Sequence, residues 1–261
     1  MVVGSNPTRS TTTTTTITTI ILVLQMQAME NIKKDLRKAA DPKKAVILQR
    51  FFKTGPGQYG EGDIFLGVMV PESRKIAKKY RSDASLQDIN ALLESKIHEE
   101  RLVALLILMQ KYSSGTEEEK DEIAKFYIKN LDMVNNWDLV DLTAPNILGA
   151  HLAYGGRSLL YKLAGSSNVW KRRVAIVATL HFIRNDDFSD TLKIAEMLLG
   201  DSHDLIHKAA GWMLREVGKR DLAAVQAFLD SHCTAMPQTM LRYAIERLPE
   251  KKRRFYMMRK T

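Results

Sequence analysis

The apolar residues of the chain recur three and four positions apart from Glu30 onward. Two clear examples are HEERLVALLILMQKY (98–112) and NVWKRRVAIVATLHFI (168–183). This spacing places apolar side chains on one face of an α-helix, whereas a half-buried strand needs alternation with a period of two, and no segment alternates in that way. The pattern therefore predicts an all-α fold.

Helix-breaking residues separate these periodic segments. Breaks are expected at Ser113 to Thr116, at Tyr154-Gly155-Gly156 and at Gly200-Asp201-Ser202, and Pro249 is expected to start the last helix. The chain should consequently consist of short helices joined by short turns.

Several predicted helices can be superimposed on one another at a nearly constant interval. Their small or apolar anchors lie 36, 35, 35 and 34 residues apart, and these are Ala104, Val140, Ala175, Ala210 and Ala244. A constant period of this size with two helices per unit is typical of a HEAT-like helical-repeat α-solenoid, whose concave face suits a DNA duplex. A helical bundle with accidentally equal helix lengths is the alternative.

The amino-terminal segment differs from the rest of the chain. It contains the threonine-rich run TTTTTTITTIILVLQ (11–25), and a charged amphipathic pattern begins only at Met29. We expect residues 1–28 to be a disordered tail, with Met26 or Met29 as better starting points, and residues 29–261 to form a single domain. The apolar stretch at 17–24 is too short to span a bilayer and lacks signal-peptide flanks, so we expect no membrane segment.

The charge of the chain favours a polyanionic partner. Its 39 Lys and Arg residues exceed its 30 Asp and Glu residues, which gives a formal net charge of +9. Basic side chains release condensed counterions from phosphates, so DNA or RNA is favoured over an anionic membrane surface. The single Cys233 rules out an internal disulfide and a thiolate metal cluster, which fits a reducing, cytoplasmic location.

One helix carries an unusual pair of side chains. In NNWDLVDLTAP (135–145), Asn135 or Asn136 can cap the helix, and Trp137 and Asp141 then share one face. Pro145 has no N–H for the carbonyl of Asp141, so the helix should kink or distort there. The simpler alternative is that the acids merely complement the positive helix end while the indole belongs to the core.

The equivalent helices of the next two repeats add aromatic and basic side chains. Equal stacking would bring Asp141, Arg173 and Trp212 towards one strip of surface. A fixed carboxylate there can stabilise the oxocarbenium character of a sugar losing its base and orient a water molecule. Arg173 can hold a phosphate. Further DNA contacts are expected from neighbouring side chains, namely Lys171, Arg172, Lys208 and Arg215.

Four segments in this order resemble the AlkD-like family of DNA alkylation repair glycosylases. They are FFKTGPGQYGEGDIFLGVMVPESRKIAKKY (51–80), VNNWDLVDLTAPNILG (134–149), VWKRRVAIVATLHFIR (169–184) and HKAAGWMLREVGKRD (207–221). The resemblance implies that Asp141 is the catalytic aspartate, that Trp137 and Trp212 are aromatic cleft residues and that Arg173 is the cleft arginine, with Arg172 as a neighbouring candidate. It also implies excision of cationic lesions such as 3-methyladenine and 7-methylguanine, with the lesion left in the base stack.

Three other segments of the sequence bear on function. GPGQYG (55–60) matches a dinucleotide-binding pattern but lacks the strand and helix this needs, so we expect a flexible loop. The family resemblance implies that this loop lies near the DNA, with Lys53 and Tyr59 as its contacts. His203 and His207 have a zinc-like spacing without a third ligand, and we expect helix-surface histidines. The basic segment KKRRFYMMRK (251–260) is either a solvated helix end or a phosphate contact.

Together these patterns and the family resemblance predict a monomeric, monofunctional DNA glycosylase without cofactor or metal, acting on double-stranded DNA. Two rivals stay open. One is a HEAT-like scaffold without enzymatic activity that binds DNA or protein, because a fold does not fix a function. The other is a DNA-binding relative that recognises bulky or branched structures without excising a base.

Overall fold

A computed structural model describes residues 27–260 of the chain, and within this range the protein is helical and contains no strand. The all-α prediction is confirmed. Residues 1–26 of the predicted tail lie outside the described residues, and residues 27 and 28 already belong to a helix. The chain divides into two compact units, with the division between Gln110 and Lys111. The sequence predicts a single domain over residues 29–261.

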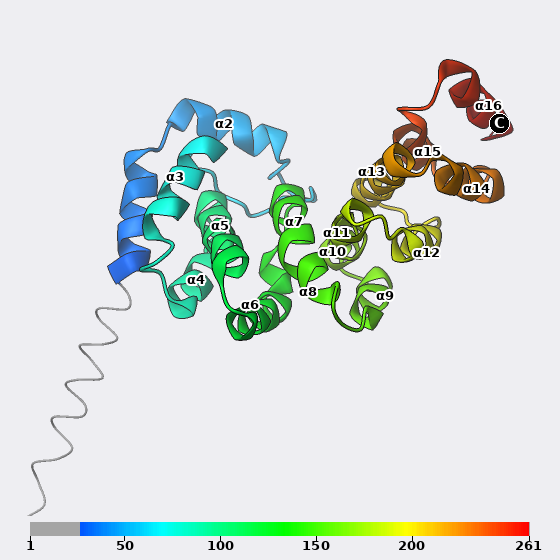
Figure 1. The fold of residues 1–261 in the computed structure, drawn as a ribbon. Helices are drawn as coiled ribbons and strands as arrows, with labels where there is room; N and C mark the ends of the chain where they lie inside the picture. The colour runs from blue at the N-terminus through cyan, green and yellow to red at the C-terminus, as the bar shows by residue number, and fades with distance from the viewer. Residues whose placement is uncertain (1–26, 261) are drawn as a thin grey trace, which may run out of the picture. The chain divides into compact units, whose positions relative to one another are not determined.

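The first unit contains a helix at residues 27–38 and four further helices (Figure 1). These are α2 (Pro42–Phe51), α3 (Val70–Tyr80), α4 (Leu86–Leu93) and α5 (His98–Ser114), whose last residues belong to the second unit. Side chains tie the first helix to its neighbours. Asp35 accepts hydrogen bonds from Lys79 (2.7 Å) and the Tyr80 hydroxyl (2.9 Å) of α3, and Asp88 of α4 accepts one from the Met29 amide (3.2 Å).

A loop joins α2 to α3 and carries the glycine-rich motif of residues 55–60. As predicted, no helix follows Gly62 before α3 begins at Val70. The buried carboxylate of Glu99, at the start of α5, accepts hydrogen bonds from the backbone amides of Leu66, Gly67 and Val68 at 2.8 to 3.2 Å. Three amides, two of them buried, thus have an acceptor, and the end of the loop is fixed to α5.

The second unit contains the remaining helices (Figure 1). The longer ones are α6 (Glu117–Lys129), α10 (Val169–Ala178), α12 (Ser189–Met197), α13 (Asp204–Arg220), α14 (Leu222–His232), α15 (Gln238–Ile245) and α16 (Glu250–Lys260). Shorter pieces are the 3₁₀ turn Leu131–Met133, α7 (Trp137–Thr143), the π-helix Pro145–Gly149, α8 (Ala150–Leu152), α9 (Ser158–Ala164) and α11 (Leu180–Arg184).

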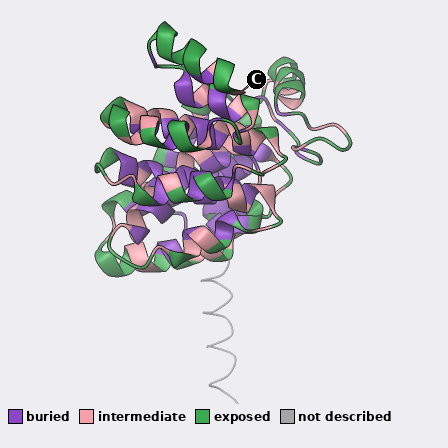
Figure 2. Cartoon of the chain, turned by 90° about the vertical axis from the view of Figure 1, so that its right-hand side faces the viewer, coloured by how far each residue is buried: buried purple, intermediate pink, exposed green. Residues whose placement is uncertain are grey.

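Equivalent helices of this unit stack in sequence order. Helix α7 contacts α10, α10 contacts α13, and α13 contacts α15, while α9, α12 and α14 pack against the same series. The anchors Val140, Ala175, Ala210 and Ala244 are all buried on these contacts. Figure 2 shows that buried residues line the facing sides of the helices, whereas exposed residues lie on their outer sides. This nearest-neighbour stacking is what a helical-repeat solenoid requires.

The close approach of α13 and α15 depends on one glycine. A Cβ atom on Gly211 of α13 would lie 2.5 Å from the carbonyl oxygen of Met240 and 2.6 Å from the Cβ atom of Tyr243, both in α15. Any larger residue would push the two helices apart. This explains why the position that follows the anchor is a glycine in this repeat, whereas isoleucine follows the anchors Ala175 and Ala244.

The predicted helix ends are confirmed, with one difference. Helix α5 ends at Ser114, and Thr116 caps α6 through a reciprocal pair of hydrogen bonds with Glu119. Helix α16 follows Pro249 directly. The apolar period of residues 168–183 runs without a break, but the helix there is interrupted at Thr179, whose hydroxyl donates to the carbonyl of Ile176 (2.6 Å). Such local hydrogen bonds compete with helix geometry, and the apolar period does not report them.

The predicted distortion at Pro145 is present and takes the form of a π-helix. Because Pro145 lacks an N–H, the regular pattern is broken, and the amide of Gly149 bonds the carbonyl of Ala144 five residues earlier (2.8 Å). The side-chain amide of Asn146 donates to the carbonyl of Leu142 (2.7 Å). One turn of the helix is therefore widened directly after Asp141.

Candidate active site

Helix α7 begins in a way that fixes the orientation of Asp141. The fully buried Asn136 is the N-cap, and its Oδ1 atom accepts a hydrogen bond from the amide of Trp137 (2.8 Å). Of the two asparagines considered from the sequence, Asn136 therefore caps the helix. Leu139 and Val140 are buried, which turns Trp137 and Asp141 towards a different, partly exposed side of α7.

The carboxylate of Asp141 forms a two-point ion pair with Arg173 of α10. The Nε atom of Arg173 donates to Oδ1 at 2.9 Å, and Nη2 donates to Oδ2 at 2.8 Å. Arg173 is only 6% exposed, whereas the side chain of Asp141 is 20% exposed. A carboxylate has about four acceptor sites, and Arg173 uses two of them. The aspartate is thus held rigidly and keeps part of its surface open to solvent.

Burial raises the pKa of the Asp141 carboxyl above its ordinary value of 3.8, because the charged form loses contact with water. The charge and hydrogen bonds of Arg173 oppose this change in pKa, and the nearby Asp138 adds to it. Ionised Asp141 is therefore costly to keep in this position, and Arg173 is the group that offsets the cost.

Arg173 is itself fixed by a second helix. Its Nη1 atom donates to the backbone carbonyl of Leu205, in the first turn of α13, at 2.5 Å. One guanidinium thereby joins three successive helices of the stack, α7, α10 and α13. The planar fork of arginine suits this arrangement, since its donors keep a fixed geometry. The phosphate contact expected of Arg173 stays a prediction.

The two candidate tryptophans are both partly exposed. Trp137 lies one turn before Asp141 on α7. Trp212 lies on α13, and its indole N–H donates to the carboxylate of Glu216 one turn later (3.1 Å). The structure thus joins Asp141 to Arg173 directly and places Trp137 beside Asp141 in the same helix, while Trp212 belongs to the helix that Arg173 reaches through Leu205.

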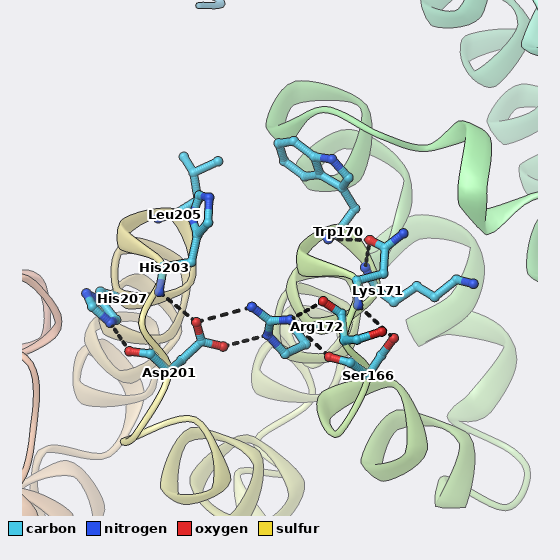
Figure 3. A network of polar contacts seen from close by, with 10 residues as sticks. Ser166, Trp170, Lys171, Arg172, Asp201, His203, Leu205 and His207 are labelled. Atoms are coloured by element: carbon cyan, nitrogen blue, oxygen red, sulfur yellow. Dashed lines mark hydrogen bonds and ion pairs between the residues drawn. The ribbon is translucent and has the colours of Figure 1, made fainter. Parts of the chain in front are cut away.

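Arg172 has a different partner from Arg173. It pairs with Asp201, from Nε to Oδ2 at 2.6 Å and from Nη2 to Oδ1 at 3.3 Å, and it also donates to the carbonyls of Ser166 and Ser167 at 2.9 Å (Figure 3). Asp201 is 5% exposed and also accepts the amide of His203 (2.8 Å). The two adjacent arginines therefore hold two different aspartates.

Sequence reasoning missed Asp201, which it treated only as part of a helix break. Asp201 lies in the loop between α12 and α13, where no helical periodicity indicates which residue it faces. It meets Arg172 only because the folded chain brings this loop next to α10. The histidines expected on the helix surface both lie here (Figure 3): His203 caps α13 and accepts the amide of Leu205 (3.2 Å), and His207 bonds the carbonyl of Asp201 (2.5 Å).

The other expected DNA contacts in the second unit pair with acids. Lys171 pairs with Asp132 (2.8 Å) and Lys208 with Asp204 (2.6 Å). Arg215 pairs with Glu246 and, at 3.4 Å, with Glu216. A phosphate would have to compete with these carboxylates for each cation.

In the first unit, Lys53 and Tyr59 lie near each other on the loop between α2 and α3, with the ammonium 6.0 Å from the centre of the ring. The Tyr59 hydroxyl donates to the carbonyl of Phe51 (3.3 Å). Lys53 is exposed and has a positive φ of 52°, which marks the sharp turn that ends α2. Their expected role in DNA binding stays a prediction.

Comparison with known proteins identifies the family of the chain. Residues 32–248 match the family model described as DNA alkylation repair enzyme. A solved structure, "Predicted DNA alkylation repair enzyme from Enterococcus faecalis", is similar with a TM-score of 0.63 and 20% identity, covering 81% of this chain and 97% of that one. At that identity the structural likeness concerns the fold. No curated protein matches the chain significantly. No described helix has the length and apolar character needed to cross a membrane. The family match covers most of the sequence, and the chain belongs to the DNA alkylation repair enzyme family.

Proposed function

We propose that the protein is a monofunctional DNA glycosylase that acts as a monomer and hydrolyses the N-glycosidic bond of cationic N3- and N7-alkylated purines, such as 3-methyladenine and 7-methylguanine, in double-stranded DNA. The observation that supports this most strongly is the Asp141 carboxylate. It is fixed at two points by Arg173, is removed from most of the solvent, and still keeps a fifth of its side chain exposed.

A carboxylate held in this way suits the chemistry of base release. As the glycosidic bond breaks, its electron pair leaves with the positively charged base, which becomes neutral, and the deoxyribose develops oxocarbenium character. A preorganised anion with little surrounding water stabilises that charge more than it would in bulk solvent. Asp141 then takes a proton from the water whose oxygen bonds to C1′ of the sugar.

One well-placed carboxylate is sufficient for such substrates. Hydrolysis of an ordinary glycoside needs a second carboxyl group to protonate the leaving oxygen, but an alkylated purine is already positively charged. The indole faces of Trp137 and Trp212 are suited to an electron-poor sugar or base through cation–π attraction, which contributes about 0.5–2 kcal/mol. We assign Arg173 the role of a positioning residue that acts through Asp141.

The test compares Asp141→Asn with Asp138→Asn, which removes a neighbouring acid of the same helix. Single-turnover release of 7-methylguanine from methylated duplex DNA should fall by about 10²–10³ in Asp141→Asn, as expected for loss of a preorganised electrostatic group. Asp138→Asn should keep most of the activity, and both variants should bind undamaged DNA about as well as the wild type. Equal release by Asp141→Asn and wild type would refute the role of Asp141 and favour a DNA-binding protein without enzymatic activity.

A further inference from the structure

Helix α16 lies outside the part of the chain that matches the family. The match ends at residue 248, and α16 spans Glu250–Lys260. Its sequence, EKKRRFYMMRK, contains six basic residues and one acid. The helix thus carries a net of five positive charges, more than half of the formal net charge of +9 of the whole chain.

The helix is attached to the second unit by its buried side. Tyr256 is buried, and its hydroxyl donates to Asp230 of α14 (3.0 Å). Burial and this hydrogen bond raise the pKa of Tyr256 to about 12, so the phenol keeps its proton over the ordinary pH range. Arg259 also reaches Asp230 (3.4 Å), and Lys260 donates to the carbonyl of Thr234 (2.8 Å). The carboxyl-terminal end of α16 is therefore fixed in place.

The amino-terminal half of α16 carries cations that the rest of the described chain does not neutralise. Arg254 pairs with Glu250 of the same helix. Lys251, Lys252 and Arg253 are exposed, and within residues 27–260 none of them forms an ion pair with an acid. This differs from Lys171, Arg172 and Arg215, whose charges are all compensated by carboxylates.

We propose that α16 is a second DNA-binding surface, in which Lys251, Lys252 and Arg253 bind phosphates of the duplex outside the site of base release. The proposal rests on the proposed function for its choice of DNA as the partner. Charge complementarity carries it: three uncompensated cations on a fixed helix meet a polymer with one negative charge per about 1.7 Å of its axis.

The apolar side chains of α16 argue against a membrane surface as the partner. An interfacial helix buries a broad apolar face in the lipid headgroup region. Here the exposed large apolar side chains are Phe255 at 48% and Met258 at 70%, and they lie between basic residues, with the Arg259 guanidinium 5.5 Å from the centre of the Phe255 ring.

The test is the salt dependence of binding to unmodified duplex DNA, measured by fluorescence anisotropy with full-length protein. Each phosphate contact contributes about 0.9 to the slope of log K against log salt concentration. In the triple variant Lys251→Gln, Lys252→Gln, Arg253→Gln, the slope should flatten by about 2–3. The matched control is Lys129→Gln, Lys162→Gln, Lys193→Gln, which removes the same charge from exposed positions on α6, α9 and α12 and should change the slope by less than about 1.

Two results would overturn the proposal. One is an equal effect of both triple variants, which would mean that only net charge matters. The other is an unchanged DNA slope together with loss of binding to phosphatidylserine vesicles, which would assign α16 to a membrane. Because the DNA carries no lesion, the outcome is independent of catalysis: if the wild type releases no base yet the α16 variant flattens the slope, the proposed function fails and the second surface stands.

Discussion

Replacement of Arg173 by glutamine should lower the stability of the second unit by an amount that follows from the geometry of the Asp141 pair. Removing one member of a buried ion pair costs about 3–5 kcal/mol. The side chain of Asp141 is 20% exposed and gains some solvation when the partner is lost, which favours the lower end, about 3 kcal/mol. For a unit of this size, 1 kcal/mol corresponds to about 2–4 °C, so Tm should fall by about 6–12 °C.

The same variant should move the pH dependence of base release. Desolvation raises the pKa of Asp141 above 3.8 and Arg173 opposes that change, so the pKa rises further once Arg173 is gone. Because the proposed mechanism needs the anion, the acidic limb of kcat/KM should lie above pH 3.8 in the wild type and at still higher pH in Arg173→Gln. A raised pKa of Asp141 in the folded protein disfavours the folded state once this carboxyl ionises. The difference in Tm between wild type and Arg173→Gln should therefore be largest near neutral pH and should shrink in acid, where Asp141 is protonated in both proteins.

Arg172→Gln is the matched control. Arg172 also forms a buried pair, with side-chain exposures of 16% for the arginine and 5% for Asp201, and it also holds backbone carbonyls. Its loss should destabilise the protein comparably but leave the acidic limb where it is. The two measurements are thermal unfolding by circular dichroism and single-turnover base release as a function of pH. A limb that stays fixed in Arg173→Gln, or that moves equally in both variants, would refute the assignment of Arg173 to Asp141.

Two further variants test the packing and the aromatic residues. Gly211→Ala should lower the free energy of unfolding, measured by urea denaturation, by about 1–3 kcal/mol, because its Cβ would meet Met240 and Tyr243 at 2.5 and 2.6 Å. The control Gly200→Ala should be nearly neutral, since a Cβ there would have no atom within 4 Å. Equal effects of the two variants would contradict the close approach of α13 and α15. Trp212→Ala should slow base release by a factor of about 2–30, the loss of one cation–π contact, while Trp212→Phe, which loses the same hydrogen bond to Glu216 but keeps a ring, should lose less. A loss as large in the phenylalanine variant would show that the indole N–H, and not the aromatic face, is what matters.

Local signals of the sequence predicted the helices and most of their ends. The run Ser113 to Thr116, the cap at Asn136 and the effect of Pro145 each act within a few residues, so a pattern of neighbours is enough to find them. The interval of about 35 residues between the anchors predicted which helices stack, because every repeat must bury the same face. The interruption at Thr179 escaped because a side-chain hydrogen bond breaks the helix without changing its apolar period.

Contacts between repeats were harder to predict. The sequence placed Arg173 near Asp141 only through the equal spacing of the helices, and it left Arg172 as an alternative. Adjacent residues of a helix point about 100° apart, so whether Arg172 or Arg173 faces Asp141 depends on how α10 is rotated about its axis. The residue pattern alone does not fix this rotation. The burial of His98, Glu99, Glu100 and Arg101 at the start of α5 was not anticipated either, because charged residues in a first helical turn ordinarily face solvent.

The widened turn at Pro145–Gly149 sets how α7, the helix directly before it, is rotated about its axis. A π turn holds one residue more than an α turn, so the segment before it is rotated by about 100° relative to where an uninterrupted helix would put it. At the end of the turn, Gly149 lies so close to the Ala178 carbonyl of α10 that a Cβ there would be 2.3 Å from the oxygen. Before it, Asp141 meets Arg173 of the same α10. Deleting a single residue between these two contacts would leave the composition of the chain almost untouched and yet turn the carboxylate by about 100° around the axis of α7, so the pairing with Arg173 depends on the length of this segment as well as on the presence of the aspartate.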